Sequence, residues 1–163
     1  MVKPCNIVAA LVVTALNLSS FSAWADAPNS RPNVIVVEGL GRTIFYHLGY
    51  ERRIGDRIAL GVGASHRRLS ASRLNETETL LPIYTTVYFK LWGQRLFATE
   101  GFNLGVFTNN AQGKTVASID IGAALGVGYE FRANNGLLVR ATGYLLIGGT
   151  ILPWFGGTVG YAW

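Results

Sequence analysis

After residue 25, the sequence alternates between apolar residues and polar or small residues over several long stretches. The clearest stretch runs from Ala117 to Arg132, where every second residue is apolar and the residues between them are mostly small or charged. A period of two residues indicates a strand whose two faces meet different surroundings. The same pattern recurs over residues 44–51, 57–65, 81–91, 137–147 and 154–163, so it predicts strands throughout this part of the chain.

Two kinds of connection separate these stretches. Short turns are predicted at residues 54–56, 92–95 and 133–136, and more open connections at 39–42, 67–78, 108–114 and 148–152. Together these seven connections divide the chain into eight strands, and an even number of strands brings both chain termini to one side of the barrel. Short turns at one end and longer loops at the other are typical of outer-membrane barrels. We therefore predict an all-β fold, an eight-stranded antiparallel up-and-down transmembrane β-barrel.

Composition favours a membrane barrel over a soluble lipocalin-like barrel or a sandwich. Charged residues make up 14% of the chain, well below the roughly 25% of soluble domains. Many of the 20 glycines lie on the polar faces, which suits the narrow interior of a small barrel. Because lipid offers no hydrogen bonds to the backbone, a sheet that spans a membrane has to close on itself.

One stretch, between Leu96 and Phe107, fits the alternation with a single exception. The residues that share its apolar parity include Glu100, whose charge would point toward lipid. A charge on the lipid face is costly at depth. Two alternatives stay open from the sequence: Glu100 lies near the periplasmic edge of the membrane, or a bulge near Gly101 shifts the register.

Residues 1–25 have the pattern of a cleaved secretory signal peptide, which leaves residues 26–163 as the barrel. Lys3 precedes an apolar segment over residues 7–18, and Ala23-Trp24-Ala25 supplies the small residues that signal peptidase needs. The apolar segment is too short to span a bilayer, which takes about 20 residues. The chain's one cysteine, Cys5, lies inside this signal. We expect export to the outer membrane of a Gram-negative bacterium and a barrel without disulfides.

The last residues carry a second targeting pattern. Val159, Tyr161 and Trp163 place an apolar or aromatic side chain at every second position up to an aromatic end. This pattern resembles the terminal signal of outer-membrane proteins that the barrel assembly machinery reads. These three residues are therefore the expected assembly signal, and that machinery is an expected partner.

With these two signals and the predicted strands, the whole of residues 26–163 resembles small eight-stranded outer-membrane barrels of the OmpX and OmpA-barrel types. The stretch 46–53, which contains the triplet Tyr50-Glu51-Arg52, also resembles the second strand of many bacterial barrel proteins. The resemblance implies a location among outer-membrane lipids and lipopolysaccharide, and it implies no cofactor and no metal.

The predicted inward parity collects ionisable side chains that we expect to form a paired network in the lumen. An isolated charge inside a narrow barrel is costly, and both signs are present. Since eight strands leave an interior just wide enough for side chains to fill, we expect a structural or surface-interaction role without catalysis; a narrow ion channel is the alternative. The expected network consists of Glu38, His47, Glu51, Arg53, Arg57, Lys90, Asp120, Glu130, Arg132 and Arg140.

The turn at residues 133–136 also predicts a strand register. A hairpin loop of three residues ends in a left-handed residue, and Gly136 can adopt that conformation. Centring the turn on Asn135 pairs Phe131 with Val139 and Glu130 with Arg140. This register keeps the apolar faces of the two strands on the same side.

A lipid A-modifying enzyme of the deacylase type is a second alternative, because enzymes of this kind use small barrels. Ser65, His66 and the acids Glu76 and Glu78 supply the residue types of a nucleophilic triad. Adjacent residues of a strand point to opposite faces, however, so Ser65 and His66 are not expected to meet. The sequence contains no metal-ligand cluster and no phosphate-binding loop.

Basic residues suggest one kind of partner and exclude another. Arg67, Arg68 and Arg73 lie in the second open connection, where their guanidinium groups suit the phosphates of lipopolysaccharide; a solvated loop is the alternative. The formal net charge of +5 comes from residues scattered along the chain. We therefore expect no nucleic-acid partner.

Overall fold

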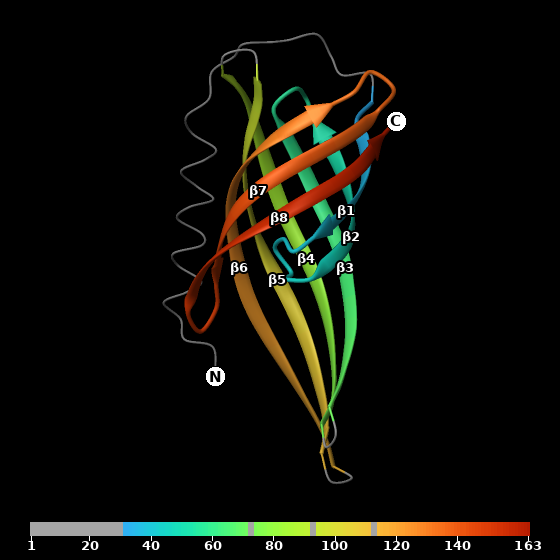
Figure 1. The fold of residues 1–163 in the computed structure, drawn as a ribbon, viewed down its shortest axis with the longest axis vertical. Helices are drawn as coiled ribbons and strands as arrows, with labels where there is room; N and C mark the ends of the chain where they lie inside the picture. Colours follow the sequence, from blue (N-terminus) through green and yellow to red (C-terminus); the bar gives the residue numbers. More distant parts are fainter. Residues whose placement is uncertain (1–30, 72–73, 92–93, 112–113) are drawn as a thin grey trace.

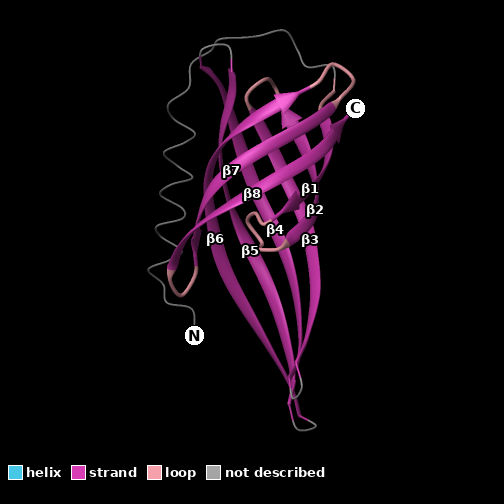
Figure 2. Ribbon diagram, viewed as in Figure 1, coloured by secondary structure: helices cyan, strands magenta, loops and turns pink. Residues whose placement is uncertain are grey.

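The computed structural model describes residues 31–71, 74–91, 94–111 and 114–163. The expected signal peptide, residues 1–25, lies outside the described residues. Figure 2 shows that the described elements are strands joined by loops and turns. They are β1 (Asn33–Gly39), β2 (Tyr46–Ile54), β3 (Ile58–Ala71), β4 (Leu74–Leu91), β5 (Gln94–Ala111), β6 (Lys114–Arg132), β7 (Leu137–Ile147) and β8 (Ile151–Ala162).

The strands form a closed barrel in chain order, in which each strand pairs with its neighbours and β1 closes against β8. All of these pairings are antiparallel. The predicted fold class and strand number are therefore confirmed. Among the described residues, no helix is long and apolar enough to cross a bilayer.

The barrel has two different ends (Figure 1). We call one the turn end; it holds the β2–β3, β4–β5 and β6–β7 connections and Trp163. We call the other the loop end; it holds the β1–β2, β3–β4, β5–β6 and β7–β8 connections. At the loop end, β3 to β6 extend far beyond the other four strands and form what we call the projecting sheet.

The projecting sheet corrects two of the predicted loops. Residues 67–78 and 108–114 were expected as open connections, but β3 and β4 continue to Ala71 and from Leu74, and β5 and β6 to Ala111 and from Lys114. Polar residues made these segments resemble loops. In the sheet they form cross-strand pairs instead, such as Arg67 opposite Glu78, and such pairs stabilise strands in water.

Alternation along the strands separates a filled interior from an apolar exterior. In β2 and β7, buried and exposed residues alternate without interruption. The outward-facing residues around the wall are apolar and remain exposed, which requires surroundings other than water. They include Ile35, Leu48, Val62, Ile83, Phe102, Val127, Val139 and Val159.

The register around Glu100 is continuous, so the bulge considered near Gly101 is not formed. Glu100 pairs with Thr85 of β4 and Leu125 of β6. Gly101 pairs with the next residue of each strand, Tyr84 and Ala124, so no extra residue is inserted. Inward residues of β5 are therefore the odd-numbered ones, and Glu100 belongs to the outward face.

The predicted β6–β7 register is confirmed. Glu130 pairs with Arg140 and Phe131 with Val139. Gly136 has a φ of 102°, in the left-handed region that favours glycine. The turn thus places an acid and a base directly opposite each other on the inward face.

Large inward aromatic side chains lie directly opposite glycines. Tyr84 pairs with Gly61 on one side and Gly101 on the other, and Phe97 pairs with Gly128. A Cβ atom added at Gly61 would lie 2.2 Å from the Tyr84 ring. At Gly128, the added atom would lie 2.5 Å from the Phe97 ring. The inward glycines therefore provide the space that the aromatic rings occupy.

We predict that Gly61→Ala destabilises the barrel by about 1–3 kcal/mol, because the added methyl group displaces the Tyr84 ring. Urea unfolding of the barrel in lipid vesicles measures the loss. Gly157→Ala is the matched control, since a Cβ atom there has no neighbour within 4 Å. Equal stability of the two variants would contradict the packing role of Gly61.

Candidate functional site

The centre of the lumen holds a buried ion network around Arg140. Its Nη1 and Nη2 atoms donate to the two carboxylate oxygens of Glu51, at 2.6 and 2.7 Å. Its Nε atom donates to Oε2 of Glu130 at 2.8 Å, and Nη2 also donates to the Tyr88 hydroxyl at 2.7 Å. Arg140 therefore joins two carboxylates that come from different strands, and all of these groups are buried.

Glu130 extends this network toward the turn end. Its Oε1 atom accepts from Nη2 of Arg53 at 2.8 Å and from Nη1 of Arg95 at 3.2 Å. The Arg53 guanidinium also lies over the Tyr88 ring, 4.5 Å from its centroid. One carboxylate is thus shared by three arginines, and charge-assisted hydrogen bonds of this kind are among the strongest in proteins.

A second cluster fills the lumen toward the loop end. Glu38 accepts from the Arg42 backbone at 3.1 Å, from the Arg42 Nε at 3.4 Å and from the Tyr144 hydroxyl at 2.5 Å. The Arg42 guanidinium lies 3.5 Å from the centroid of the Tyr84 ring. The Tyr84 hydroxyl donates to Glu51 at 3.1 Å and so connects the two clusters.

Arg42 reaches the lumen from the β1–β2 loop rather than from a strand. Leu40 and Ile44 on either side of it have φ values of 57° and 71°, a region that costs a residue with a side chain roughly 1–2 kcal/mol. Asn103 of β5 donates to the Arg42 carbonyl at 2.7 Å. The folded-in loop therefore accepts backbone strain in order to place a guanidinium beside Glu38.

His47 completes this cluster. Its Nδ1 atom lies 3.2 Å from Oε2 of Glu38, and its ring meets the Tyr84 ring edge-on at a centroid distance of 6.1 Å. Both groups are buried. His47 thus adds a ring that occupies space beside Glu38.

These side chains nearly fill the middle of the barrel. The cavity among Glu38, His47, Glu51 and Arg140 has a volume of only about 10 Å³. A water molecule needs about 10–15 Å³ measured in this way. This section of the lumen therefore has room for about one water molecule beside the side chains that line it.

The expected network residues separate into two groups. Glu38, His47, Glu51, Arg53, Glu130 and Arg140 are buried and lie in the two clusters just described. Arg57 and Arg132 are partly buried at the turn end, and Lys90 is exposed at the same end, one residue before the end of β4. Asp120 is exposed on the projecting sheet, outside the lumen, because β7 ends opposite Ala123.

Two arginines and three tyrosines of the network were missed in the sequence. Arg42 was assigned to a loop, and nothing in the alternation shows that a loop folds inward. Arg95 was assigned to the turn at residues 92–95, but β5 begins at Gln94 and gives Arg95 the inward parity of its odd-numbered residues. Tyr84, Tyr88 and Tyr144 carry the inward parity, which was the available signal. Their hydroxyl groups donate to or accept from the buried charges.

The residues considered for an enzyme do not come together among the described residues. Ser65 is buried on the inward face, whereas His66 is exposed on the opposite face. The His66 Nδ1 atom lies 2.9 Å from the Thr79 hydroxyl, and Glu78 is paired with Arg67. No group of three or more potential metal ligands occurs in the described ranges.

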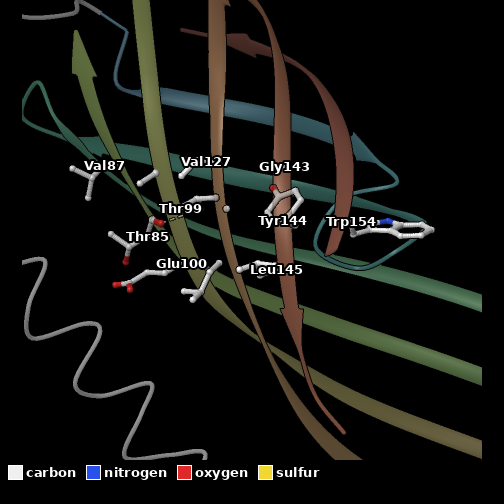
Figure 3. A pocket seen from close by; sticks show the side chains of 12 residues that line it. Thr85, Val87, Thr99, Glu100, Val127, Gly143, Tyr144, Leu145 and Trp154 are labelled. Atoms are coloured by element: carbon white, nitrogen blue, oxygen red, sulfur yellow. Dashed lines mark hydrogen bonds between the residues drawn. The ribbon is translucent and has the colours of Figure 1, made fainter. Parts of the chain in front are cut away.

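A depression of about 430 Å³ lies along the wall formed by β4 to β7 (Figure 3). Thr85, Glu100, Val127 and Leu145 line it. Tyr144 and Trp154 also line it, and in the same view they lie to the right of Thr85 and Glu100. Most of its lining is apolar, so the carboxylate of Glu100 is the chemical exception on this part of the wall.

The other expected site residues lie at the two ends. Arg67 is half-buried in the projecting sheet over the Phe45 ring, 4.0 Å from its centroid, and Arg68 is exposed. Arg73 lies outside the described residues. Val159, Tyr161 and Trp163 all face outward and are exposed at the end of the chain. Trp163 exchanges backbone hydrogen bonds with Asn33, at 3.0 and 3.2 Å.

No family model matches the sequence, and no curated protein sequence matches it. Solved structures match its fold. The N-terminal β-barrel domain of Pseudomonas aeruginosa OprF is similar with a TM-score of 0.59 and 16% identity, over 82% of this chain and 98% of that domain. Neisserial surface protein A (NspA) gives 0.54 and 10% identity, over 80% and 93% of the two chains.

Ail, the attachment invasion locus protein of Yersinia pestis, gives a TM-score of 0.50 and 10% identity, over 80% of this chain and 91% of Ail. At these identities the likeness concerns the fold. The chain therefore has the fold of small eight-stranded outer-membrane β-barrels.

We predict that Arg140→Met destabilises the barrel by about 3–5 kcal/mol, because Glu51 and Glu130 lose the cation that joins them. Urea unfolding in lipid vesicles measures this. In a double-mutant cycle, Glu51→Gln combined with Arg140→Met should lose less than the sum of the single losses. Arg52→Met, on the exposed side of the wall, is the control and should change stability by at most about 0.5 kcal/mol. Additive losses would mean that Glu51 and Arg140 do not stabilise each other.

Proposed function

We propose that this chain is an outer-membrane barrel of a Gram-negative bacterium with a structural and surface-interaction role and without catalysis. In this proposal its lumen is closed, and its projecting sheet is the interaction surface outside the cell. The fold similarity to small outer-membrane barrels supports the location. The observation that carries the role is the pair of open sheet edges at the loop end.

These edges follow from the unequal lengths of neighbouring strands. The β2–β3 ladder ends at Leu48 and Ala64, and the Tyr46 hydroxyl still donates to the His66 carbonyl, so β3 continues from 67 to 71 without β2 beside it. The β6–β7 ladder ends at Ala123 and Ile147, so β6 has no β7 partner over 114–122. Open edges present backbone donors and acceptors to which another strand can add.

The β6 edge also carries apolar side chains. Val116 is 64% exposed and Ile119 is 78% exposed. Both belong to the stretch beyond β7, where the ladder to β5 continues on one side only. Unpaired backbone together with exposed apolar surface favours contact with another molecule over simple solvation.

The closed lumen supports a structural role over a channel. The two buried clusters cross the barrel from β1 to β7, and the space left between them, about 10 Å³, has room for about one water molecule. The separation of Ser65 from His66 gives no support to a hydrolase. The lumen network therefore serves stability in this proposal, and the interaction takes place at the loop end.

Lipopolysaccharide is the partner that we propose at the base of the projecting sheet. Arg68 is exposed and Arg67 half-buried just beyond the last β2–β3 pair. Arg73 lies further along the same hairpin in the sequence. Arginine binds phosphate through two parallel hydrogen bonds. The part of the guanidinium of Arg67 that pairs with Glu78 is already engaged, so Arg68 is the stronger candidate.

The proposed orientation predicts which end reagents reach from outside the cell. In Ser118→Cys, on the projecting sheet, a membrane-impermeant maleimide should label intact cells. In Asp56→Cys, at the turn end, labelling should require permeabilised cells. Neither position competes with another cysteine if the segment containing Cys5 is cleaved. Labelling of Asp56→Cys alone on intact cells would reverse the orientation and remove the proposed surface role.

The proposed contact between lipopolysaccharide and Arg68 leads to a second prediction. Lipopolysaccharide titrated into the detergent-solubilised barrel should bind Arg68→Gln with about a tenfold lower affinity, the loss expected for one charge-assisted contact. Isothermal titration calorimetry measures the affinity. Arg52→Gln, at the turn end, removes the same charge and should leave the affinity unchanged. An equal effect of both substitutions would point to nonspecific charge attraction instead.

A further inference from the structure

The turn end of the barrel collects positive charge on the side that faces the lumen. In the registers of β2 to β6, residues of inward parity near this end include Arg53, Arg57, Lys90, Arg95 and Arg132, and Arg31 lies just before β1. Among the described residues of this end, the side-chain carboxylates are Glu130 and Asp56. Among the described residues, cations thus outnumber side-chain carboxylates at this end of the barrel.

Two of these cations face each other directly. Lys90 of β4 pairs with Arg95 of β5. Like charges in directly opposite positions destabilise an antiparallel pair. Arg132 also lies near Arg53 and Arg95, whose charges repel it, and near Glu130, whose charge attracts it. The mouth therefore holds its cations against mutual repulsion, which an anion would relieve.

The turn end also has few hydrogen-bond acceptors for its arginine side chains. Glu130 already accepts from Arg53, Arg95 and Arg140. The buried Nη1 atoms of Arg31 and Arg132 find no hydrogen-bond acceptor among the described residues. Arg132 instead places its Nη2 atom 3.3 Å from the Arg31 carbonyl. Buried guanidinium donors without acceptors are costly, so additional oxygen atoms in the mouth would stabilise them.

We propose that the lumen mouth at the turn end, around Lys90, Arg95 and Arg132, binds a phosphate-bearing anion. Several cations converge there, which favours a multiply charged phosphate over a single carboxylate. Guanidinium groups match phosphate oxygens in geometry as well as charge. Lys90 is exposed, and Arg57, Arg95 and Arg132 are partly exposed, so the ligand enters from this end without disturbing the closed lumen.

The site is separate from the lipopolysaccharide contacts proposed at Arg68. The phosphate could come from a soluble anion or from the headgroup of a phospholipid at the rim of the barrel. Both sources share the chemistry that the mouth recognises. They differ in whether the group is tethered to the membrane, and an experiment can separate them.

The test uses the full barrel in phosphatidylcholine nanodiscs, titrated with tripolyphosphate by calorimetry at low ionic strength. We expect saturable binding. In Lys90→Gln/Arg132→Gln the affinity should fall about tenfold or more, because two cations of the mouth are neutralised. Arg52→Gln removes a charge at the same end but on the outer side of the wall, and it should retain the affinity within about twofold. Absence of saturable binding, or an equal loss in Arg52→Gln, would overturn the proposal.

Stability gives an independent readout. Tripolyphosphate should raise the urea midpoint of the unmodified barrel, because a ligand that binds the folded state stabilises it. The midpoint of Lys90→Gln/Arg132→Gln should not respond. If this variant does not fold, Lys90→Gln alone replaces it, since it relieves a repulsion and leaves the Glu130 contacts intact. An equal rise in the unmodified and variant barrels would overturn the proposal.

Nanodiscs that contain phosphatidylglycerol identify the source. If headgroups occupy the mouth, these discs should weaken tripolyphosphate binding to the unmodified barrel by competition. If the affinity stays the same, the ligand is a soluble phosphate. Either result supports the site, because both require the calorimetric difference between the Lys90→Gln/Arg132→Gln and Arg52→Gln variants.

Discussion

Pairing of buried charge in a space with little room for water is the constraint on which this barrel depends. Glu38, Glu51 and Glu130 are buried inside a wall of eight strands. Each carboxylate has to find its cation within the protein, since the remaining cavity has room for only about one water molecule. Arg140 meets this requirement for two of them, and Arg42 for the third.

The aromatic rings and the glycines follow from the same constraint. Tyr84, Tyr88 and Tyr144 place hydroxyl groups on the buried charges and rings beneath the guanidinium groups. Rings of this size fit the narrow lumen only where the facing strand has no side chain, as at Gly61. The glycines of the wall therefore make room for the aromatic rings, and these rings in turn contact the paired charges.

The sequence predicted the fold and much of the inward face because the period-2 pattern reports directly on which side of the wall a residue lies. Glu130 and Arg140 could be paired in advance from the turn at Gly136, since a hairpin turn sets the register on both strands. Arg42 could not be placed in this way, because its position depends on a loop held inward by Asn103 and Glu38.

The projecting sheet was misjudged for a different reason. Polar composition does not distinguish a solvated loop from a strand that has left the membrane. The cross-strand partners of residues such as Arg67 and Glu78 become visible only when the hairpin is folded. Asp120 was assigned to the lumen on parity alone, although parity carries no information about height along the barrel axis.

The closing ladder between β1 and β8 has a consequence for how the barrel opens. It pairs β1 over Val34–Gly39, and Asn33 and Trp163 add two backbone hydrogen bonds, whereas the β4–β5 ladder runs over residues 75–91 of β4. A short ladder has fewer backbone hydrogen bonds to lose. The free energy needed to separate two neighbouring strands therefore differs around the barrel. The short ladders around β1 and β2 therefore need less free energy to separate than the long hairpins of β3 to β6, which form the rigid half of the barrel.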